Sequence, residues 1–323
     1  MTIKHLVMSG GGPTLIQTLG ALYHLDTNEF LNLKDIETIY GTSAGAIIGV
    51  CISLKFDWET INDYLIKRPW QDVFPIKVQN ILDAYTKKGI YDIKNIEKCF
   101  KPLFDAKDIP IDINLDDFYK ITNVELHFFA FEINEYKVED ISHLTHPTIS
   151  VLTAIQMTCA LPILITPICI DDKCYVDGGM ACNYPLNYCI ESGKQPHEIL
   201  GFKNKYSDTK NNITGESNLL EFLMSFIYKA IFSLSTDKCQ PIIANEVICD
   251  VSNLNFDFLK DAVSNIEVRK ELFESGVSCA KTFLSKSTSN ENSNNSNEEK
   301  DSSEKNKEID IDKELENSIQ ELN

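Results

Sequence analysis

The sequence predicts an α/β fold with a largely parallel central sheet. Two observations lead to this prediction. Short runs of β-branched and aromatic residues alternate with stretches of helical periodicity along most of the chain. Each of the first two runs is followed by a glycine-containing turn and then by a helical stretch, which is the order expected of parallel strands covered by helices.

The first 55 residues contain the clearest structural unit. A strand is predicted at His5–Ser9, and a glycine run then leads into a helix from Thr14 to about His24. A second strand is predicted at Ile36–Tyr40, and a sharp turn leads into a helix from Ala44 to about Leu54. Three leucines of the first helix share one face, so this helix is expected to pack on the sheet.

Two further strands and one long helix are predicted later in the chain. The strands are Glu125–Phe131 and Lys173–Val176. The helix, Leu219 to Leu234, carries Glu221 and Lys229 and is shorter than the roughly 20 apolar residues that span a bilayer. Its bulky side chains are spread around the helix, which fits either burial in the core or one wall of an acyl-chain pocket.

The composition changes abruptly near Ser285. Residues 286–323 are rich in Ser, Asn, Glu and Lys and lack aromatic residues, which is typical of disorder. Four aliphatic residues in this segment recur at helical spacing: Ile311, Leu315, Ile319 and Leu322. A short amphipathic helix bound to a protein partner is therefore the alternative to a solvated tail. We predict a folded domain over residues 1–285 and an acidic tail over residues 286–323.

The net charge argues against two classes of partner, nucleic acids and anionic membranes. The formal charge is -18 at pH 7, whereas nucleic-acid binding relies on clustered Lys and Arg, so no nucleic-acid partner is expected. The same charge disfavours docking on anionic membranes, so any lipid contact should be mainly apolar.

The N-terminal segment and the cysteines indicate the compartment. The chain enters its first glycine run without an apolar stretch of about 7–15 residues, so no secretory signal is expected. An intracellular protein is predicted, cytoplasmic or peripherally associated with a membrane. The ten cysteines are scattered from Cys51 to Cys279 without a C-x-x-C pair and are expected to be buried free thiols.

Residues Gly41–Gly45 form the pattern G-x-S-x-G around Ser43. The pattern lies directly after a predicted strand and directly before a predicted helix, as in the nucleophile elbow of serine hydrolases. Such a turn forces the serine into a strained conformation that exposes its hydroxyl, and side chains larger than Gly41 and Gly45 would clash. The pattern also occurs by chance, but this position favours Ser43 as a nucleophile.

A glycine triplet, Gly10, Gly11 and Gly12, follows the first predicted strand. Its backbone N–H groups lie where a helix starts, so they can point at an anion and form an oxyanion hole. The competing interpretation is a nucleotide-binding loop. Leu15 stands at the last glycine position of G-x-G-x-x-G and no Walker ending follows, which argues against nucleotide binding.

The serine hydroxyl needs a base, and Asp177 is the best-placed carboxylate. It follows a predicted strand and precedes Gly178 and Gly179. Two glycines after a carboxylate indicate a tight turn that allows close approach to another backbone. An ordinary turn is the alternative for an isolated Asp-Gly-Gly, but the serine elbow favours a catalytic base.

These three motifs, in this order and spacing, resemble the patatin-like phospholipase family. The stretch Ala154–Pro162 is also similar to the family's segment before the aspartate motif. The resemblance covers roughly residues 4–200 well. It implies a three-layer α/β/α fold and a Ser-Asp dyad that cleaves acyl esters of phospholipids or neutral lipids without metal or other cofactor.

The resemblance also implies a role for each motif. Ser43 takes the nucleophile role, Asp177 the base role and the glycine triplet the oxyanion-hole role. Because a carboxylate with an ordinary pKa near 4 is a weak base, the site is expected to be partly desolvated. Many relatives carry a basic residue after the triplet, where this chain has Pro13 and Thr14, and this difference leaves the headgroup preference open.

Two alternative functions fit the sequence. An esterase of the α/β-hydrolase type would use Ser43, Asp177 and His197, which stand in that fold's triad order. A non-catalytic lipid-binding scaffold would keep the fold and be recruited through its acidic tail. The expected partners are a lipid substrate at a membrane or micelle interface and a protein that contacts the tail.

Overall fold

The computed structural model describes residues 2–75, 78–206, 213–234, 240–251 and 255–286. The chain divides into one compact unit, Met1–Ala280, and a second unit, Lys281–Asn323. Of the second unit, residues 281–286 are described and are helical. The predicted acidic tail lies outside the described residues apart from Lys286, so the predicted domain boundary stays a prediction.

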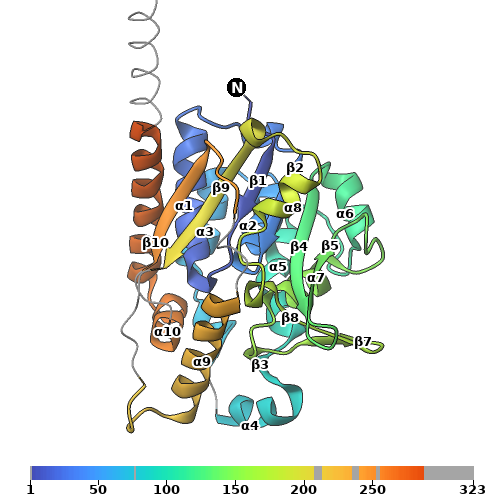
Figure 1. Ribbon diagram of the computed structural model, residues 1–323, viewed down its shortest axis with the longest axis vertical. Helices are drawn as coiled ribbons and strands as arrows, with labels where there is room; N and C mark the ends of the chain where they lie inside the picture. The colour runs from blue at the N-terminus through green and yellow to red at the C-terminus, as the bar shows by residue number, and fades with distance from the viewer. Residues whose placement is uncertain (1, 76–77, 207–212, 235–239, 252–254, 287–323) are drawn as a thin grey trace, which may run out of the picture. The chain divides into compact units, whose positions relative to one another are not determined.

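The first unit is built on an eight-stranded mixed sheet with the order β10-β9-β1-β2-β4-β8-β7, in which β5 also pairs with β4 (Figure 1). The strands from β10 to β4 run parallel, whereas β5, β8 and β7 join the sheet by antiparallel pairs. The predicted α/β fold with a largely parallel sheet is confirmed. The sheet strands are β1 (His5–Met8), β2 (Thr38–Thr42), β4 (Glu125–Glu132), β5 (Lys137–Ile141), β7 (Ile168–Ile170), β8 (Lys173–Asp177), β9 (Ile199–Tyr206) and β10 (Glu246–Val251).

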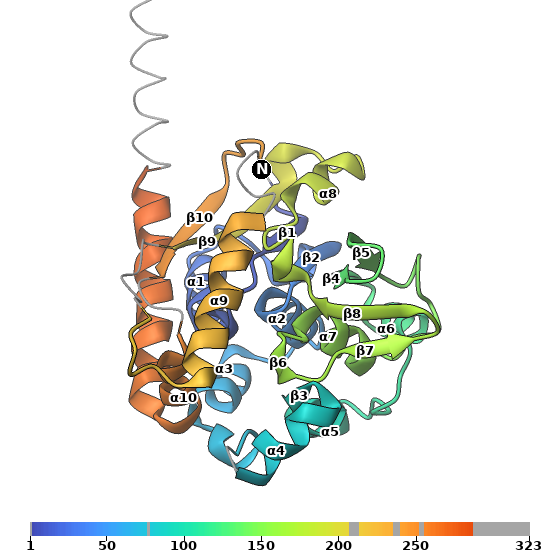
Figure 2. The same ribbon diagram turned by 60° about the horizontal axis from the view of Figure 1, so that its bottom comes forward.

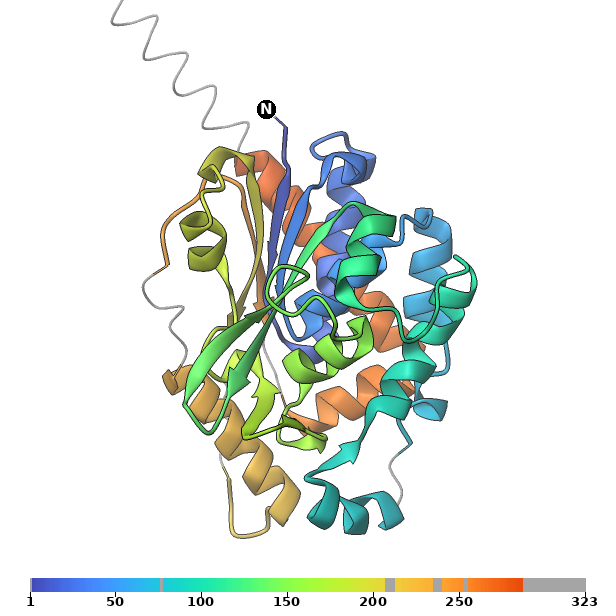
Figure 3. The ribbon, with the colours of Figure 1, turned by 90° about the vertical axis from the view of Figure 1, so that its right-hand side faces the viewer.

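Helices cover the central strands on both faces (Figure 1, Figure 3). On one face, α2 packs on β2 and α7 packs on β4, and α1 packs beside α2. On the other face, α8 contacts β1 and β2, and a buried cluster that includes Val7, Tyr40 and Leu186 fills the space between. These helices are α1 (Leu15–Thr27), α2 (Ala44–Ser53), α7 (Val151–Cys159) and α8 (Leu186–Glu191).

The remaining elements surround this framework. A small second sheet pairs β3 (Gly89–Tyr91) with β6 (Ile163–Ile165). The helix that is predicted over residues 219–234 is present as α9. None of the helices in the described part of the chain has the length and apolarity needed to cross a bilayer. Further helices are α3 (Trp58–Lys67), α4 (Val78–Lys87), α5 (Ile93–Asp105), α6 (Leu115–Thr122), α9 (Leu219–Leu234) and α10 (Phe256–Ser264), with 3-10 turns η1 (Gly12–Thr14), η2 (Leu33–Asp35), η3 (Trp70–Asp72), η4 (Gly178–Met180) and η5 (Pro196–Glu198). Residues 266–280 of the first unit are also helical.

The second strand differs from its predicted bounds. It was expected at residues 36–40 but covers Thr38–Thr42, because its parallel pairing with β1 and β4 continues through Gly41 and Thr42. Both β1 and β2 are buried along their whole length, as expected of strands with neighbours on each side and helices on each face. The later end of β2 brings the strand directly to Ser43.

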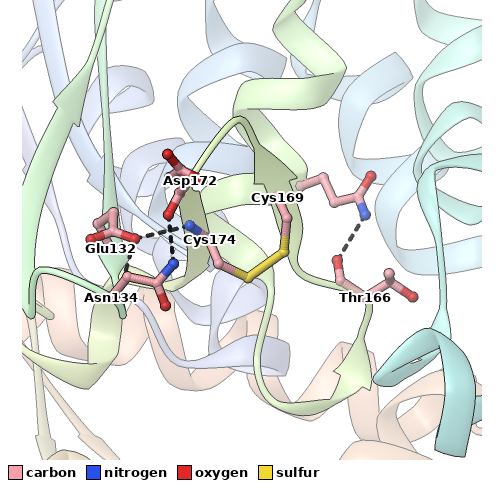
Figure 4. The surroundings of a disulfide bond; sticks show 7 residues. Glu132, Asn134, Thr166, Cys169, Asp172 and Cys174 are labelled. Carbon is pink, nitrogen blue, oxygen red and sulfur yellow. Dashed lines mark hydrogen bonds between the residues drawn. A yellow bond between two sulfur atoms is a disulfide. The ribbon is translucent and has the colours of Figure 1, made fainter.

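The hairpin of β7 and β8 contains a disulfide bond between Cys169 and Cys174 (Figure 4). These residues stand directly opposite each other in the antiparallel register. The expectation that all cysteines are free is therefore wrong for this pair, because the hairpin turn brings together two residues whose spacing carries no recognised motif. Six of the other described cysteines are free thiols: Cys51, Cys99, Cys159, Cys189, Cys249 and Cys279.

Glu132 fixes this hairpin to the end of β4 (Figure 4). Its carboxylate is fully buried and accepts hydrogen bonds from the backbone N–H groups of Cys174, Asn134 and Glu135. Burial alone would raise the pKa of Glu132, but the three donors hold it below its ordinary value. The strand that ends at Asp177 is thus held in place at its start.

Candidate active site

Ser43 is the single residue between β2 and α2. Its backbone angles, φ 50° and ψ -116°, lie in a region that non-glycine residues rarely adopt. A Cβ atom at Gly41 would lie 2.7 Å from the nitrogen of Ala46, and one at Gly45 would lie 2.4 Å from the carbonyl oxygen of Met8. The predicted strained strand-to-helix turn is present, and both flanking glycines are required by close backbone contacts.

Thr158 holds the backbone of this turn. The N–H group of Ser43 donates to Oγ1 of Thr158 at 2.9 Å, and the Thr158 hydroxyl donates to the carbonyl oxygen of Phe129 at 2.5 Å. Thr158 lies near the end of α7 and is fully buried. It therefore links the turn to strand β4. The sequence analysis did not single out Thr158, although it lies within the stretch Ala154–Pro162 that resembles the patatin-like family.

Asp177 ends β8 and lies beside Ser43. The Ser43 hydroxyl donates to Oδ2 of Asp177 at 2.7 Å, and the N–H group of Gly179 donates to Oδ1 at 2.8 Å. A Cβ atom at Gly178 would lie 2.0 Å from the carbonyl oxygen of Phe129, so only glycine fits there. The two motifs that are 134 residues apart in the sequence are brought into hydrogen-bond contact.

The carboxyl group of Asp177 is desolvated. Burial raises its pKa from 3.8 to about 6, although the hydrogen bonds from Ser43 and Gly179 favour the charged form and act in the opposite direction. The Asp177 carboxyl is thus buried, as the sequence analysis expects of this group. A carboxylate with this pKa is a stronger base than an exposed one and is still ionised at neutral pH.

The glycine triplet lies on the other side of Ser43. The N–H group of Gly10 donates to the carbonyl oxygen of Asn183 at 3.1 Å. The carbonyl oxygen of Gly10 accepts from the side chains of Asn183, Asn204 and Tyr206. These three side chains, which sequence reasoning missed because they come from distant segments, hold the loop against the sheet.

Gly11 and Gly12 complete the loop. Gly12 has a φ of 57°, a left-handed conformation that favours glycine. Within the described part of the chain, the N–H groups of Gly11 and Gly12 donate to no protein group. Both residues line a pocket of about 170 Å³ that Ser43 and Asp177 also line. Gly11, Gly12 and Ser43 therefore border one space.

A larger apolar cavity, of about 480 Å³, adjoins this pocket. Its walls come from α3, η3, α5 and α10 and include Tyr64, Trp70 and Phe100. The two spaces share seven lining residues: Gly12, Leu15, Ile47, Cys159, Leu164, Ile165 and Leu259. Helix α9 lines the smaller pocket through Tyr228 and Ile231, so part of it is a pocket wall.

His197 lies away from this site. It is exposed in η5, which precedes β9, whereas Ser43 follows the end of β2. Strands β9, β1 and β2 are parallel. The start of β9 therefore lies at the N-terminal ends of these strands, and the end of β2 lies at their C-terminal ends. The structure contains no triad of Ser43, Asp177 and His197, and the α/β-hydrolase alternative is not supported.

The fold and this site together define a class of protein: a mixed α/β protein in which a serine at a strand-to-helix turn donates a hydrogen bond to a buried aspartate. Residues 6–190 match the sequence model of the patatin-like phospholipase family. The chain therefore belongs to the patatin-like phospholipase family, and in general terms it is a lipid-hydrolysing enzyme.

Three individual proteins are similar to the chain. The chain is 25% identical over 217 residues to the probable lipid hydrolase 463L of Invertebrate iridescent virus 6. This alignment covers 65% of this chain and 73% of the viral protein. It is 25% identical over 207 residues to the uncharacterized protein YqhO of Bacillus subtilis, covering 59% and 68%. The crystal structure of VipD from Legionella pneumophila superposes with a TM-score of 0.52 at 15% identity, covering 88% of this chain and 67% of VipD, and so shares the fold.

Proposed function

We propose that the chain is a lipid acyl hydrolase, of phospholipase A type or a neutral-lipid esterase, in which Ser43 is the nucleophile and Asp177 the base. The observation that carries this proposal is the 2.7 Å hydrogen bond from the Ser43 hydroxyl to a buried carboxylate whose pKa is raised to about 6. A nucleophile in contact with a base of matched pKa is the arrangement that covalent acyl transfer requires.

The reaction follows from this contact. Asp177 takes the proton of Ser43 as Oγ forms a bond to the ester carbonyl carbon. The tetrahedral intermediate then breaks its ester C–O bond, and the leaving alcohol takes the proton from Asp177. In the second half, Asp177 takes a proton from water, the resulting hydroxide attacks the acyl-enzyme, and the proton returns to Ser43 as the fatty acid leaves.

The negative charge of the tetrahedral intermediate is assigned to the N–H groups of Gly11 and Gly12. They line the same pocket as Ser43 and donate to no other group among the described residues. Such donors lower the barrier by about 3–4 kcal/mol each when they face the developing oxyanion. Gly10 was included in the predicted oxyanion hole, but its N–H is occupied by Asn183, so its part is to hold the loop.

The apolar cavity is assigned to the acyl chain. It adjoins the dyad's pocket and is lined mainly by aliphatic and aromatic side chains. An ester held at Ser43 with its fatty chain in this cavity would leave water and gain roughly 0.8 kcal/mol for each buried methylene group. A long-chain lipid ester is therefore a better substrate than a small polar ester.

Free fatty acid release from mixed micelles of phospholipid and neutral glyceride, without added metal, tests this function. Ser43→Ala and Asp177→Asn should each lower the rate at least ~10³-fold. Ser53→Ala is the matched control, because Ser53 lies on the same helix α2, is buried, and its hydroxyl donates to the carbonyl oxygen of Gly49 within that helix. Its rate should stay close to that of the wild type.

The substrate classes and the rival function are separated by the same measurement. Release from only one of the two lipids identifies the enzyme as a phospholipase or as a neutral-lipid esterase. Micelle binding without any release, together with no labelling of Ser43 by a fluorophosphonate, would instead support the non-catalytic lipid-binding scaffold.

A further inference from the structure

Helix α9 presents two apolar faces. One is buried and includes Met224 and Tyr228, of which Tyr228 lines the pocket of the dyad. The other is exposed and consists of Leu219, Phe222 and Phe226, which are three and four residues apart and so share one side of the helix. Among the described residues, α9 is therefore buried on one side and exposed on the other.

A second helix with exposed apolar side chains lies at the same end of the unit. On α4, Leu82 and Tyr85 are 64% and 93% exposed. Helices α4 and α9 both lie at the end where β3 and β6 are found, and Figure 2 brings this end forward. A contiguous exposed apolar patch marks a protein or membrane interaction site, whereas single exposed apolar residues are ordinary.

We propose that the exposed faces of α9 and α4 form a docking surface for a neutral lipid bilayer. This surface, termed here the docking face, consists of Leu219, Phe222 and Phe226 of α9 with Leu82 and Tyr85 of α4. Because α9 also lines the dyad's pocket, docking on this face would hold the pocket next to the lipid and let substrate pass from the bilayer to Ser43. The inference rests on the proposed function, because it gives the lipid hydrolase its route to substrate.

Helix α9 belongs both to the docking face and to the wall of the dyad's pocket. This continuity favours a lipid surface as the partner that covers the docking face. The same helix that exposes Phe222 and Phe226 also supplies Tyr228 and Ile231 to the wall around Ser43. Residues that flank α4, among them Phe74 and Tyr91, line the larger apolar cavity. Helix α9 thus lines one of the spaces assigned to the substrate, and residues on either side of α4 in the chain line the other.

The charges on the two helices specify the kind of bilayer. In sequence, α9 carries one acidic and one basic residue, Glu221 and Lys229, and α4 also carries one of each. The helices are therefore neutral, whereas the whole chain has a formal charge of -18. Without a basic cluster, attraction to anionic headgroups is absent, and apolar insertion of aromatic and aliphatic side chains provides the affinity. A zwitterionic bilayer is the expected partner.

Sedimentation with phosphatidylcholine vesicles tests the docking face. All proteins carry Ser43→Ala, so that the vesicles stay intact. The double variant Phe222→Ser, Phe226→Ser should partition at least about tenfold more weakly, since two large apolar side chains no longer enter the bilayer. Ile248→Ser on β10 is the matched control, because Ile248 is 47% exposed, close to the 48% of Phe222, but lies on another element. It should bind as the parent does.

Activity separates this inference from the proposed function. In the wild-type background, the double variant should hydrolyse a monomeric short-chain ester at the normal rate but vesicle phosphatidylcholine about tenfold more slowly, since neither phenylalanine lines either cavity. If no ester is cleaved but vesicle binding still depends on the two phenylalanines, the docking face stands and the proposed function fails.

Three results would overturn the docking face. The first is equal sedimentation of the parent and the double variant. The second is failure of the parent to bind phosphatidylcholine vesicles although the wild type hydrolyses their lipid. The third is a dimer in solution that the double variant converts to a monomer without any change in vesicle binding, which would make this surface an interface between two copies of the chain.

Discussion

Replacing Asp177 with asparagine should stabilise the folded protein at neutral pH while it abolishes hydrolysis. In the unfolded chain the carboxyl group titrates near its ordinary pKa of 3.8, whereas burial raises the pKa to about 6 in the folded protein. A difference of about two pH units costs the folded state roughly 3 kcal/mol at about 1.4 kcal/mol per unit once the group is ionised. Asparagine has the same shape, can still accept from the N–H of Gly179, and has no charge to bury.

The sign of this effect depends on pH. Below pH 3.8 the carboxyl group is protonated in both states, so it adds no penalty. Between pH 3.8 and about 6 only the unfolded chain releases the proton, so stability falls as the pH rises, and above about 6 the full penalty is present. The gain in the free energy of unfolding from Asp177→Asn should therefore approach about 3 kcal/mol at pH 8 and shrink toward zero near pH 4.

Urea unfolding at pH 4 and pH 8 measures both values. Ser43→Ala is the control, because it is equally inactive but keeps the buried carboxylate, so it should show no stabilisation that grows with pH. If Asp177→Asn is less stable than the wild type at pH 8, or if its effect is the same at both pH values, ionised Asp177 is not penalised by burial and the assignment of a raised pKa is refuted.

Three further predictions concern catalysis. The kcat/KM for a soluble ester should rise about tenfold per pH unit below pH 6 and level off above it, because the Asp177 carboxyl has a pKa of about 6 and must be ionised to act; a flat profile would exclude it as the base. Thr158→Val leaves the Ser43 N–H without its acceptor, so it should lower stability by about 1–3 kcal/mol and slow hydrolysis, whereas Thr158→Ser should restore both in unfolding and rate assays. Leu164→Trp narrows the junction of the two cavities, so the ratio of long-chain to short-chain ester hydrolysis should fall; an unchanged ratio would place the acyl chain elsewhere.

The elements of the fold that sequence reasoning could predict depend on local signals. Gly41 and Gly45 flank Ser43 because two close backbone contacts exclude larger side chains, and this requirement is visible as a short pattern. The buried strands before the elbow appear as continuous apolar runs. The position of Asp177 was predicted from the two glycines that follow it. The structure gives the reason for one of them, because Gly178 passes too close to the backbone of Phe129 to carry a side chain.

Features that depend on distant contacts were not predictable. Thr158 is an ordinary helical threonine in sequence, and its role appears only when α7 packs beside the elbow. Asn183 occupies the N–H of Gly10 and so removes one donor from the predicted oxyanion hole. The disulfide of Cys169 and Cys174 depends on the register of a hairpin, which cysteine spacing alone does not reveal.

The pairing of β9 with β1 makes the region that matches the family dependent on residues beyond it. The match to the patatin-like family ends at residue 190, but β9, Ile199–Tyr206, lies beyond it and pairs with the fully buried β1. A fragment that stops at residue 190 would expose the backbone N–H and C=O groups of β1 as a bare apolar edge, which is a template for self-association. Such a fragment should aggregate instead of folding. By pairing with β1, which leads into the glycine loop, β9 protects that strand from self-association.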